Sequence, residues 1–204
     1  LRGASVDLFV LPDADQANVD SLKHLVKMAG GKVNGVVELT DKALGSDGGD
    51  TLKSIAANSL PAGAKLSEDN LAPGMHTGQL LGAALSAGEH EASETDRGIA
   101  LGALANDDFI AYQGEAPKPA DLALVVGGNT SDDEAHGNYG TKFAAEFAAG
   151  LDSHMKGAVL AAESGSAEDN GAIGQVRADN SMKEAVSTVD NADTCLLYTS
   201  DAAD

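Results

Sequence analysis

Residues 127–138, with the sequence GGNTSDDEAHGN, hold the side-chain types most suited to binding a ligand. The two glycines follow an apolar stretch, where backbone amides can approach a bound group closely. Carboxylates and an imidazole in the same segment could hold a hard or borderline divalent cation. The candidate ligand residues are Gly127, Gly128, Asn129, Asp132, Asp133 and His136. The alternative interpretation is a solvated acidic loop, because acidic residues occur throughout the sequence.

The glycine spacing of this segment does not match that of a nucleotide-binding protein. Dinucleotide sites use GxGxxG and phosphate-binding loops use GxxxxGK[ST], and the sequence contains neither pattern. The acidic residues of the loop would also repel a phosphate group. We therefore do not expect nucleotide binding.

Two adjacent methionine–histidine pairs, Met75-His76 and His154-Met155, provide a second set of candidate ligands. Thioether and imidazole groups together suit copper. Neighbouring residues on a helix point about 100° apart, so neither pair could chelate an ion alone. Met155 also continues an apolar helical stripe, which favours a place in the core. These four residues are the weaker metal candidates.

A serine-containing turn, Glu163-Ser164-Gly165-Ser166, follows another apolar stretch. Ser164 or Ser166 could act as the nucleophile of a hydrolase-like enzyme, although a turn and helix-cap role is the usual one for serine there. The sequence has no GxSxG elbow, and its one cysteine, Cys195, lies in the terminal segment that is set aside below. We therefore predict that the protein is not an enzyme.

The segments that would position these residues alternate between strand and helix. Residues 6–11 and 33–39 read as buried strands, and a helix between them begins after Asp13 or Asp15 and ends at Gly30-Gly31. This is a βαβ unit, which implies parallel strands. Further short apolar strands are expected at residues 109–113, 122–126, 158–162 and 185–189, with an amphipathic helix over residues 139–155.

Residues 43–106 read as a helical insertion between two sheet segments, with helices at 50–59, 75–86 and after Ser93. Strands that are almost continuously apolar are typical of a parallel sheet covered on both sides. The predicted fold class is therefore α/β: a mostly parallel, Rossmann-like sheet in a three-layer arrangement, with helices on both faces.

Charge and length exclude several classes of protein. The 204 residues include 13 Lys and Arg against 32 Asp and Glu, for a formal net charge of -19. A nucleic-acid-binding protein would show a basic surface instead, so we expect no nucleic-acid partner. The sequence contains neither an apolar run of 18 residues nor a recognisable signal peptide.

The last ten residues, CLLYTSDAAD at positions 195–204, fit nothing upstream in composition or periodicity. They resemble the translation of a common transposase sequencing adapter, so they do not enter the fold prediction. We expect residues 1–194 to form a single α/β domain, cut short after Thr194.

Several segments, in order along the chain, are similar to one known family. They are LRGASVDLFVLPDADQANVDSLKHLVKMAGGKVNGVVELTD (1–41), LKSIAANSLPAGAKL (52–66), GQLLGAAL (78–85), FIAYQ (109–113), DLALVVGG (121–128) and VRADNSMKEAVSTVDNADT (176–194). Together they resemble the actinobacterial MctB family of copper transport outer membrane proteins. The resemblance covers essentially all of residues 1–194.

This resemblance implies a role in copper efflux and homeostasis in the cell envelope, with a pore formed by the full-length protein. Family members begin with a hydrophobic helix that would lie before Leu1, so we expect a membrane anchor and a domain outside the cytoplasm. Copper is implied by the resemblance alone, and a homo-oligomer is compatible with it. The alternative is a non-catalytic ligand-binding or scaffold domain of a membrane-anchored envelope protein.

Overall fold

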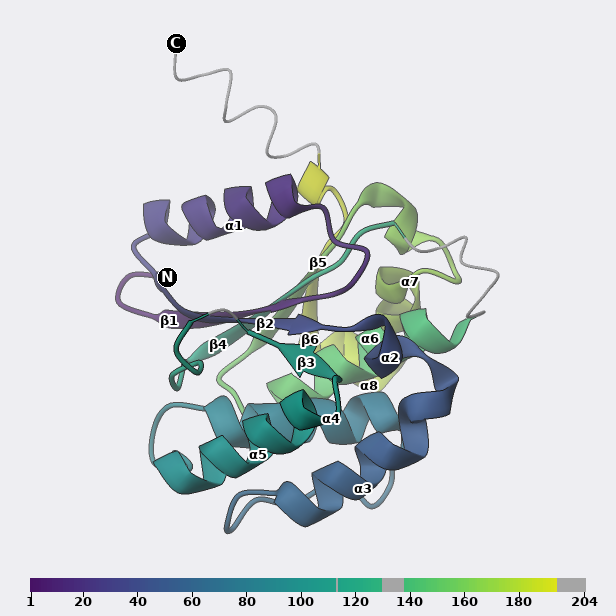
Figure 1. The fold of residues 1–204 in the computed structure, drawn as a ribbon. Coiled ribbons are helices and arrows are strands. Elements are labelled where there is room, and N and C mark those ends of the chain that lie inside the picture. The colour runs from purple at the N-terminus through teal and green to yellow at the C-terminus, as the bar shows by residue number, and fades with distance from the viewer. Residues whose placement is uncertain (113, 130–137, 194–204) are drawn as a thin grey trace.

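One six-stranded sheet organises the protein. The computed structural model describes residues 1–112, 114–129 and 138–193, and the sheet has the order β3-β2-β1-β4-β5-β6 (Figure 1). All neighbouring strands are parallel except β2 and β3, which are antiparallel. The strands are β1 (Ser5–Val10), β2 (Lys32–Leu39), β3 (Ile110–Ala111), β4 (Leu122–Val126), β5 (Ala158–Ala161) and β6 (Val186–Val189).

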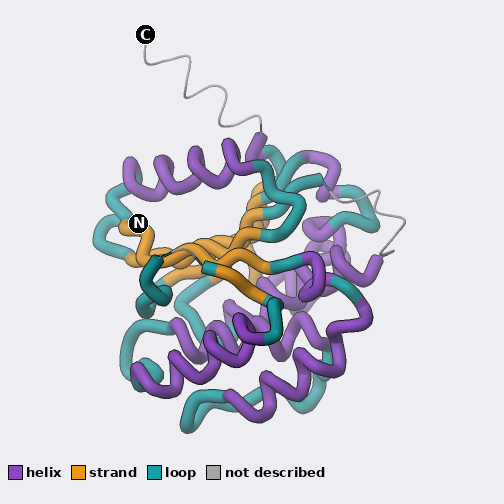
Figure 2. The backbone as a smooth tube through the Cα atoms, in the orientation of Figure 1, coloured by secondary structure: helices purple, strands orange, loops and turns teal. Residues whose placement is uncertain are grey.

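The helices cover the two faces of this sheet unequally. One helix, α1, lies alone on one face, and the other helices gather on the opposite side (Figures 1 and 2). The helices are α1 (Gln16–Met28), α2 (Asp41–Leu44), α3 (Gly49–Ser59), α4 (Pro73–Leu85), α5 (Glu94–Asn106), α6 (Asn138–Asp152), α7 (Ala172–Ala178) and α8 (Asn180–Ala185), with short 3-10 turns at Ser46–Gly48 and Ser164–Ala167. The predicted three-layer α/β class is confirmed.

Two hydrophobic clusters follow from this arrangement. Under α1, Val19 and Val26 of the helix pack against Val6 and Leu8 of β1 and against neighbouring strands. On the other face, Phe9 of β1 meets the α6 stripe, and its ring centroid lies 5.6 Å from that of Phe147 in an edge-to-face contact. Each fully buried side chain of this size contributes roughly 1.5–3 kcal/mol to stability.

Glycines allow α4 and α6 to pack with their backbones in contact. Gly74, Gly78 and Gly82 recur every fourth residue and so lie on one face of α4. A Cβ atom at Gly78 would overlap the backbone carbonyl oxygen of Phe147, and one at Gly82 would lie 3.1 Å from the Cβ of His154. All but two residues of α4 are buried, so this helix is part of the core.

Most predicted elements are present, and the differences lie in one strand and two short helices. The strand expected at 109–113 pairs over only Ile110–Ala111, because it meets just the end of β2 at the edge of the sheet. The short helices α2 and α8 were not predicted. Helix α8 begins where the Asp179 side chain accepts a hydrogen bond from the Met182 amide at 2.9 Å. Asp15 caps α1 and Ser93 caps α5, both as predicted.

Candidate functional site

The predicted ligand loop leaves the carboxyl end of β4 beside the carboxyl end of β1. Strand order reverses between these two strands, and α/β proteins bind ligands at such a switch point. The Gly128 amide donates a hydrogen bond to Oδ2 of Asp13 at 3.0 Å, and the Gly127 amide donates to the Ala161 carbonyl at 2.9 Å. Both glycine amides are therefore used within the protein.

Close packing of loops explains why glycine occurs there. A Cβ atom at Gly128 would overlap the carbonyl oxygen of Asp13, and one at Gly165 would overlap the side chain of Asn129. Only a residue without a side chain allows these loops to approach each other so closely. Gly128, one of the two glycines predicted to allow ligand approach, thus has a packing role.

Acidic groups dominate this edge of the sheet. Burial raises the pKa of Glu163 above its usual value, and the nearby carboxylates of Asp193, Asp15 and Asp13 raise it further. Such a surface repels anions and attracts cations. Asp132, Asp133 and His136 lie outside the described residues, so the assignment of the whole loop as a ligand site stays a prediction.

The serines of the turn after β5 have structural contacts. Ser166 is buried, and its hydroxyl donates a hydrogen bond to the Glu163 carbonyl at 2.7 Å, while Ser164 is exposed. These contacts close the 3-10 turn of Ser164–Ala167. They correspond to the turn role that the sequence analysis offered as the alternative to a nucleophile.

Three of the four weaker metal candidates belong to the core or its border. Met155 is buried and Met75 packs against the larger hydrophobic cluster. His76 is also buried, with its ring Nε2 3.0 Å from the carbonyl oxygen of Ser67. Because a carbonyl oxygen only accepts, Nε2 carries the hydrogen and fastens the loop before α4 to that helix.

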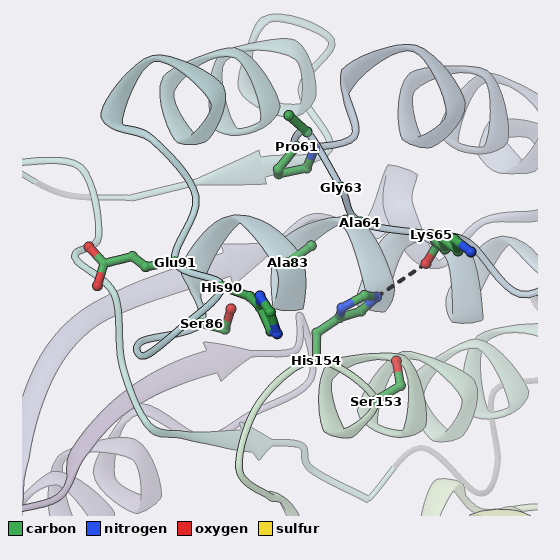
Figure 3. Close-up of a pocket in the computed structure, with 11 residues that line it drawn as sticks. Pro61, Gly63, Ala64, Lys65, Ala83, Ser86, His90, Glu91, Ser153 and His154 are labelled. Carbon is green, nitrogen blue, oxygen red and sulfur yellow. Dashed lines mark hydrogen bonds between the residues drawn. The ribbon is translucent and has the colours of Figure 1, made fainter.

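The fourth candidate, His154, lines a surface pocket of about 450 Å³ together with His90 (Figure 3). His154 follows α6 directly, and His90 lies in the connection between α4 and α5. In the view of Figure 3 the His154 ring lies on the His90 side of the pocket, and the Glu91 side chain points away from both rings. The remaining wall comes from the loop at residues 61–65, from the end of α4 at Ala83 and Ser86, and from Ser153.

The contacts of His154 define its chemical state. Its Nε2 lies 3.3 Å from the carbonyl oxygen of Lys65, so Nε2 carries the hydrogen and Nδ1 carries the lone pair. Burial lowers the pKa of His154, and the bond to Lys65 opposes that shift only in part. The ring is therefore neutral over a wider pH range than a solvated histidine, and a neutral imidazole is the form that binds metals.

Sequence reasoning did not pair His90 with His154. The two residues lie far apart in the chain, and no local spacing motif connects them. Among the described residues, no group of three or more His, Cys, Asp or Glu side chains is arranged to hold a metal ion. In the same part of the chain, no helix is both long enough and apolar enough to cross a membrane.

The fold and the pocket together define an α/β domain of Rossmann-like strand order with a histidine-lined surface pocket. The chain belongs to the MctB family: the family model described as "Copper transport outer membrane protein, MctB" matches residues 1–196. The resemblance inferred from the sequence is thereby confirmed.

Curated relatives in mycobacteria support the same assignment. "Copper transporter MctB" of Mycobacterium leprae (strain TN) is 37% identical over 202 residues, which cover 95% of this chain and 63% of the relative. The protein of the same name in Mycobacterium tuberculosis (strain ATCC 25618 / H37Rv) is 36% identical over 199 residues, with the same two coverages. The chain thus spans 63% of the length of the curated relatives it matches.

Proposed function

We propose that this chain is the extracytoplasmic α/β part of a cell-envelope protein that limits intracellular copper by contributing to its efflux. The observation that carries the proposal is the family match over residues 1–196, together with relatives named as copper transporters. The acidic character of the chain, with a formal net charge of -19 over its 204 residues, suits a cationic cargo. We propose that the domain binds and positions rather than catalyses a covalent reaction.

A chimera tests this role in cells. The domain would replace the matching residues of a mycobacterial relative, in a strain that lacks that relative. We expect the deletion strain to accumulate more copper than its parent, measured by mass spectrometry of washed cells, and the chimera to restore the parental level. The intact relative and an empty vector serve as controls. A stably expressed chimera that leaves copper at the level of the deletion strain would contradict the proposed function.

We further propose that the complete protein is anchored in the membrane, acts as a homo-oligomer and conducts ions. If so, it should resist extraction by alkaline carbonate, and the purified protein should produce discrete conductance steps in planar bilayers. This chain alone is the matched control and should produce none. A complete protein that inserts without conductance would remove the pore from the proposal. The function would then be that of the alternative, a non-catalytic ligand-binding or scaffold domain of an anchored envelope protein.

A further inference from the structure

We propose that His90 and His154 bind one copper(II) ion in the pocket of Figure 3, with Nδ1 of His154 as one of the two nitrogen ligands. The choice of copper rests on the proposed function, whereas the site itself rests on the geometry of the pocket. The inference names a binding site for the cargo on this domain.

The first support is the hydrogen bond that holds His154 in place. A metal-binding histidine usually donates its other ring N–H to a backbone carbonyl or a carboxylate, which fixes the ring and the tautomer. His154 makes such a contact through Nε2 to the Lys65 carbonyl, at 3.3 Å. Its remaining lone pair, on Nδ1, is on the side of the ring that faces His90 in Figure 3.

The second support is access from solvent. His90 is exposed, so an ion can reach the pocket, while His154 is half-buried and held by its contact with the Lys65 carbonyl. Glu91 also lines the pocket and adds negative charge at its rim.

The ligand set selects among metals. Two imidazoles provide fewer protein ligands than a structural zinc site requires, which is usually four. Copper(II) binds nitrogen ligands more strongly than nickel or zinc does, and water can complete its coordination. We therefore expect copper(II) to bind more tightly than zinc(II) or nickel(II) at this pocket.

The test uses the 204-residue chain with Cys195→Ser as the common background, so that no thiol binds or reduces the metal, and copper(II) chloride, with a competing chromophoric chelator to measure affinity. His90→Ala removes one ligand. His154→Gln removes the Nδ1 lone pair but keeps a side-chain N–H that can still donate to the Lys65 carbonyl, so the local fold is preserved. His24→Ala, at an exposed position of α1, is the matched control. Circular dichroism would confirm that every variant is folded.

We expect one copper(II) ion per chain, and a loss of affinity of about tenfold or more in each pocket variant. Electron paramagnetic resonance should detect two imidazole nitrogens on copper in the wild type, one in each pocket variant and two in His24→Ala. Wild-type affinity in both pocket variants would overturn the proposal. So would loss of binding in His136→Ala alone, because the site would then lie in the predicted ligand loop.

The outcome is separable from that of the cellular experiment. No copper binding by the purified chain would reject the histidine site, while a chimera that restores copper levels would still support the proposed function. The opposite result is also possible: the purified chain binds copper through both histidines, but the chimera does not restore the cellular copper level. That result would support the site and reject the proposed function.

Discussion

Gly78→Ala is expected to lower the free energy of unfolding by about 2 kcal/mol or more. The added Cβ would overlap the Phe147 carbonyl oxygen and would lie 3.0 Å from both Cα of Gly150 and the amide nitrogen of Leu151. All three are backbone atoms of α6, so no side chain can rotate away. The two helices would have to separate, and the contact in the core would loosen.

Gly98→Ala is the matched control for this substitution. Gly98 is exposed on α5, and a Cβ atom there would meet nothing within 4 Å. Alanine is the better helix former by about 0.5–1 kcal/mol, so this variant should be slightly more stable than the wild type. Urea unfolding followed by circular dichroism measures both changes. A Gly78→Ala variant as stable as Gly98→Ala would show that α4 and α6 do not pack as described.

The second large effect concerns Asp7, a carboxylic acid inside the core. Asp7 is 0% exposed, and within the described part of the chain neither of its carboxylate oxygens has a hydrogen-bond partner. It lies on β1 where β2 bulges between Val33 and Gly35. Burial raises the pKa of Asp7 from 3.8 to about 7, and the nearby Gly35 backbone offsets only part of that shift.

This shift fixes the direction of a pH dependence. The folded protein holds the Asp7 proton up to about pH 7, whereas the unfolded chain releases it near pH 3.8. The folded state is therefore favoured most below pH 3.8, and this contribution is lost as the pH rises to about 7. At about 1.4 kcal/mol per pH unit, the loss is on the order of 4 kcal/mol.

Asp7→Asn should remove this dependence and stabilise the protein above pH 7 by about 2 kcal/mol or more, because the amide is nearly isosteric and uncharged. The measurement is urea unfolding of both proteins between pH 4 and 8, with the difference between them as the readout. Equal stabilities at every pH would mean that Asp7 is solvated in the folded state.

Asp121→Asn provides the opposite control. A hydrogen bond from Lys156, together with bonds from Ser5, lowers the pKa of Asp121 to about 2. Its contribution to stability is therefore present above pH 3.8 and lost as the pH falls towards 2. At pH 7, Asp121→Asn should be less stable than the wild type, whereas Asp7→Asn should be more stable than the wild type.

The alternation of strands and helices could be predicted from the sequence because it depends on local patterns. Apolar runs marked the buried strands, and capping residues such as Asp15 and Ser93 marked helix starts. The strand at 109–113 was predicted too long, since its pairing depends on how far β2 extends beside it, and that is not a local property.

The glycines of α4 show how one residue type can carry two opposite signals. In the sequence they argue against a stable helix, because glycine has low helix propensity. In the fold, their spacing of four residues marks the face that meets α6. The position of α6 is needed to decide whether these glycines weaken the helix or form its packing face.

The candidate metal pocket could be predicted only in part. His154 was a candidate because of its chemistry, but His90 joins it only through the packing of α4 against α6, which the sequence does not display. Met155, the neighbour of His154 in the chain, is buried in the core, as the apolar helical stripe predicted.

The helix contact that holds α4 against α6 also sets the position of His154. The glycine row ends at Gly82, beside the Cβ of His154, while α4 itself leads into the segment that carries His90. Because the two helix backbones are already in contact, the place of His154 beside the end of α4 is set before any ion binds, and little conformational entropy is lost at this residue on binding. If His154 binds an ion as proposed, a substitution in the middle of α4 should weaken that binding as well as lower stability, although it lies outside the pocket.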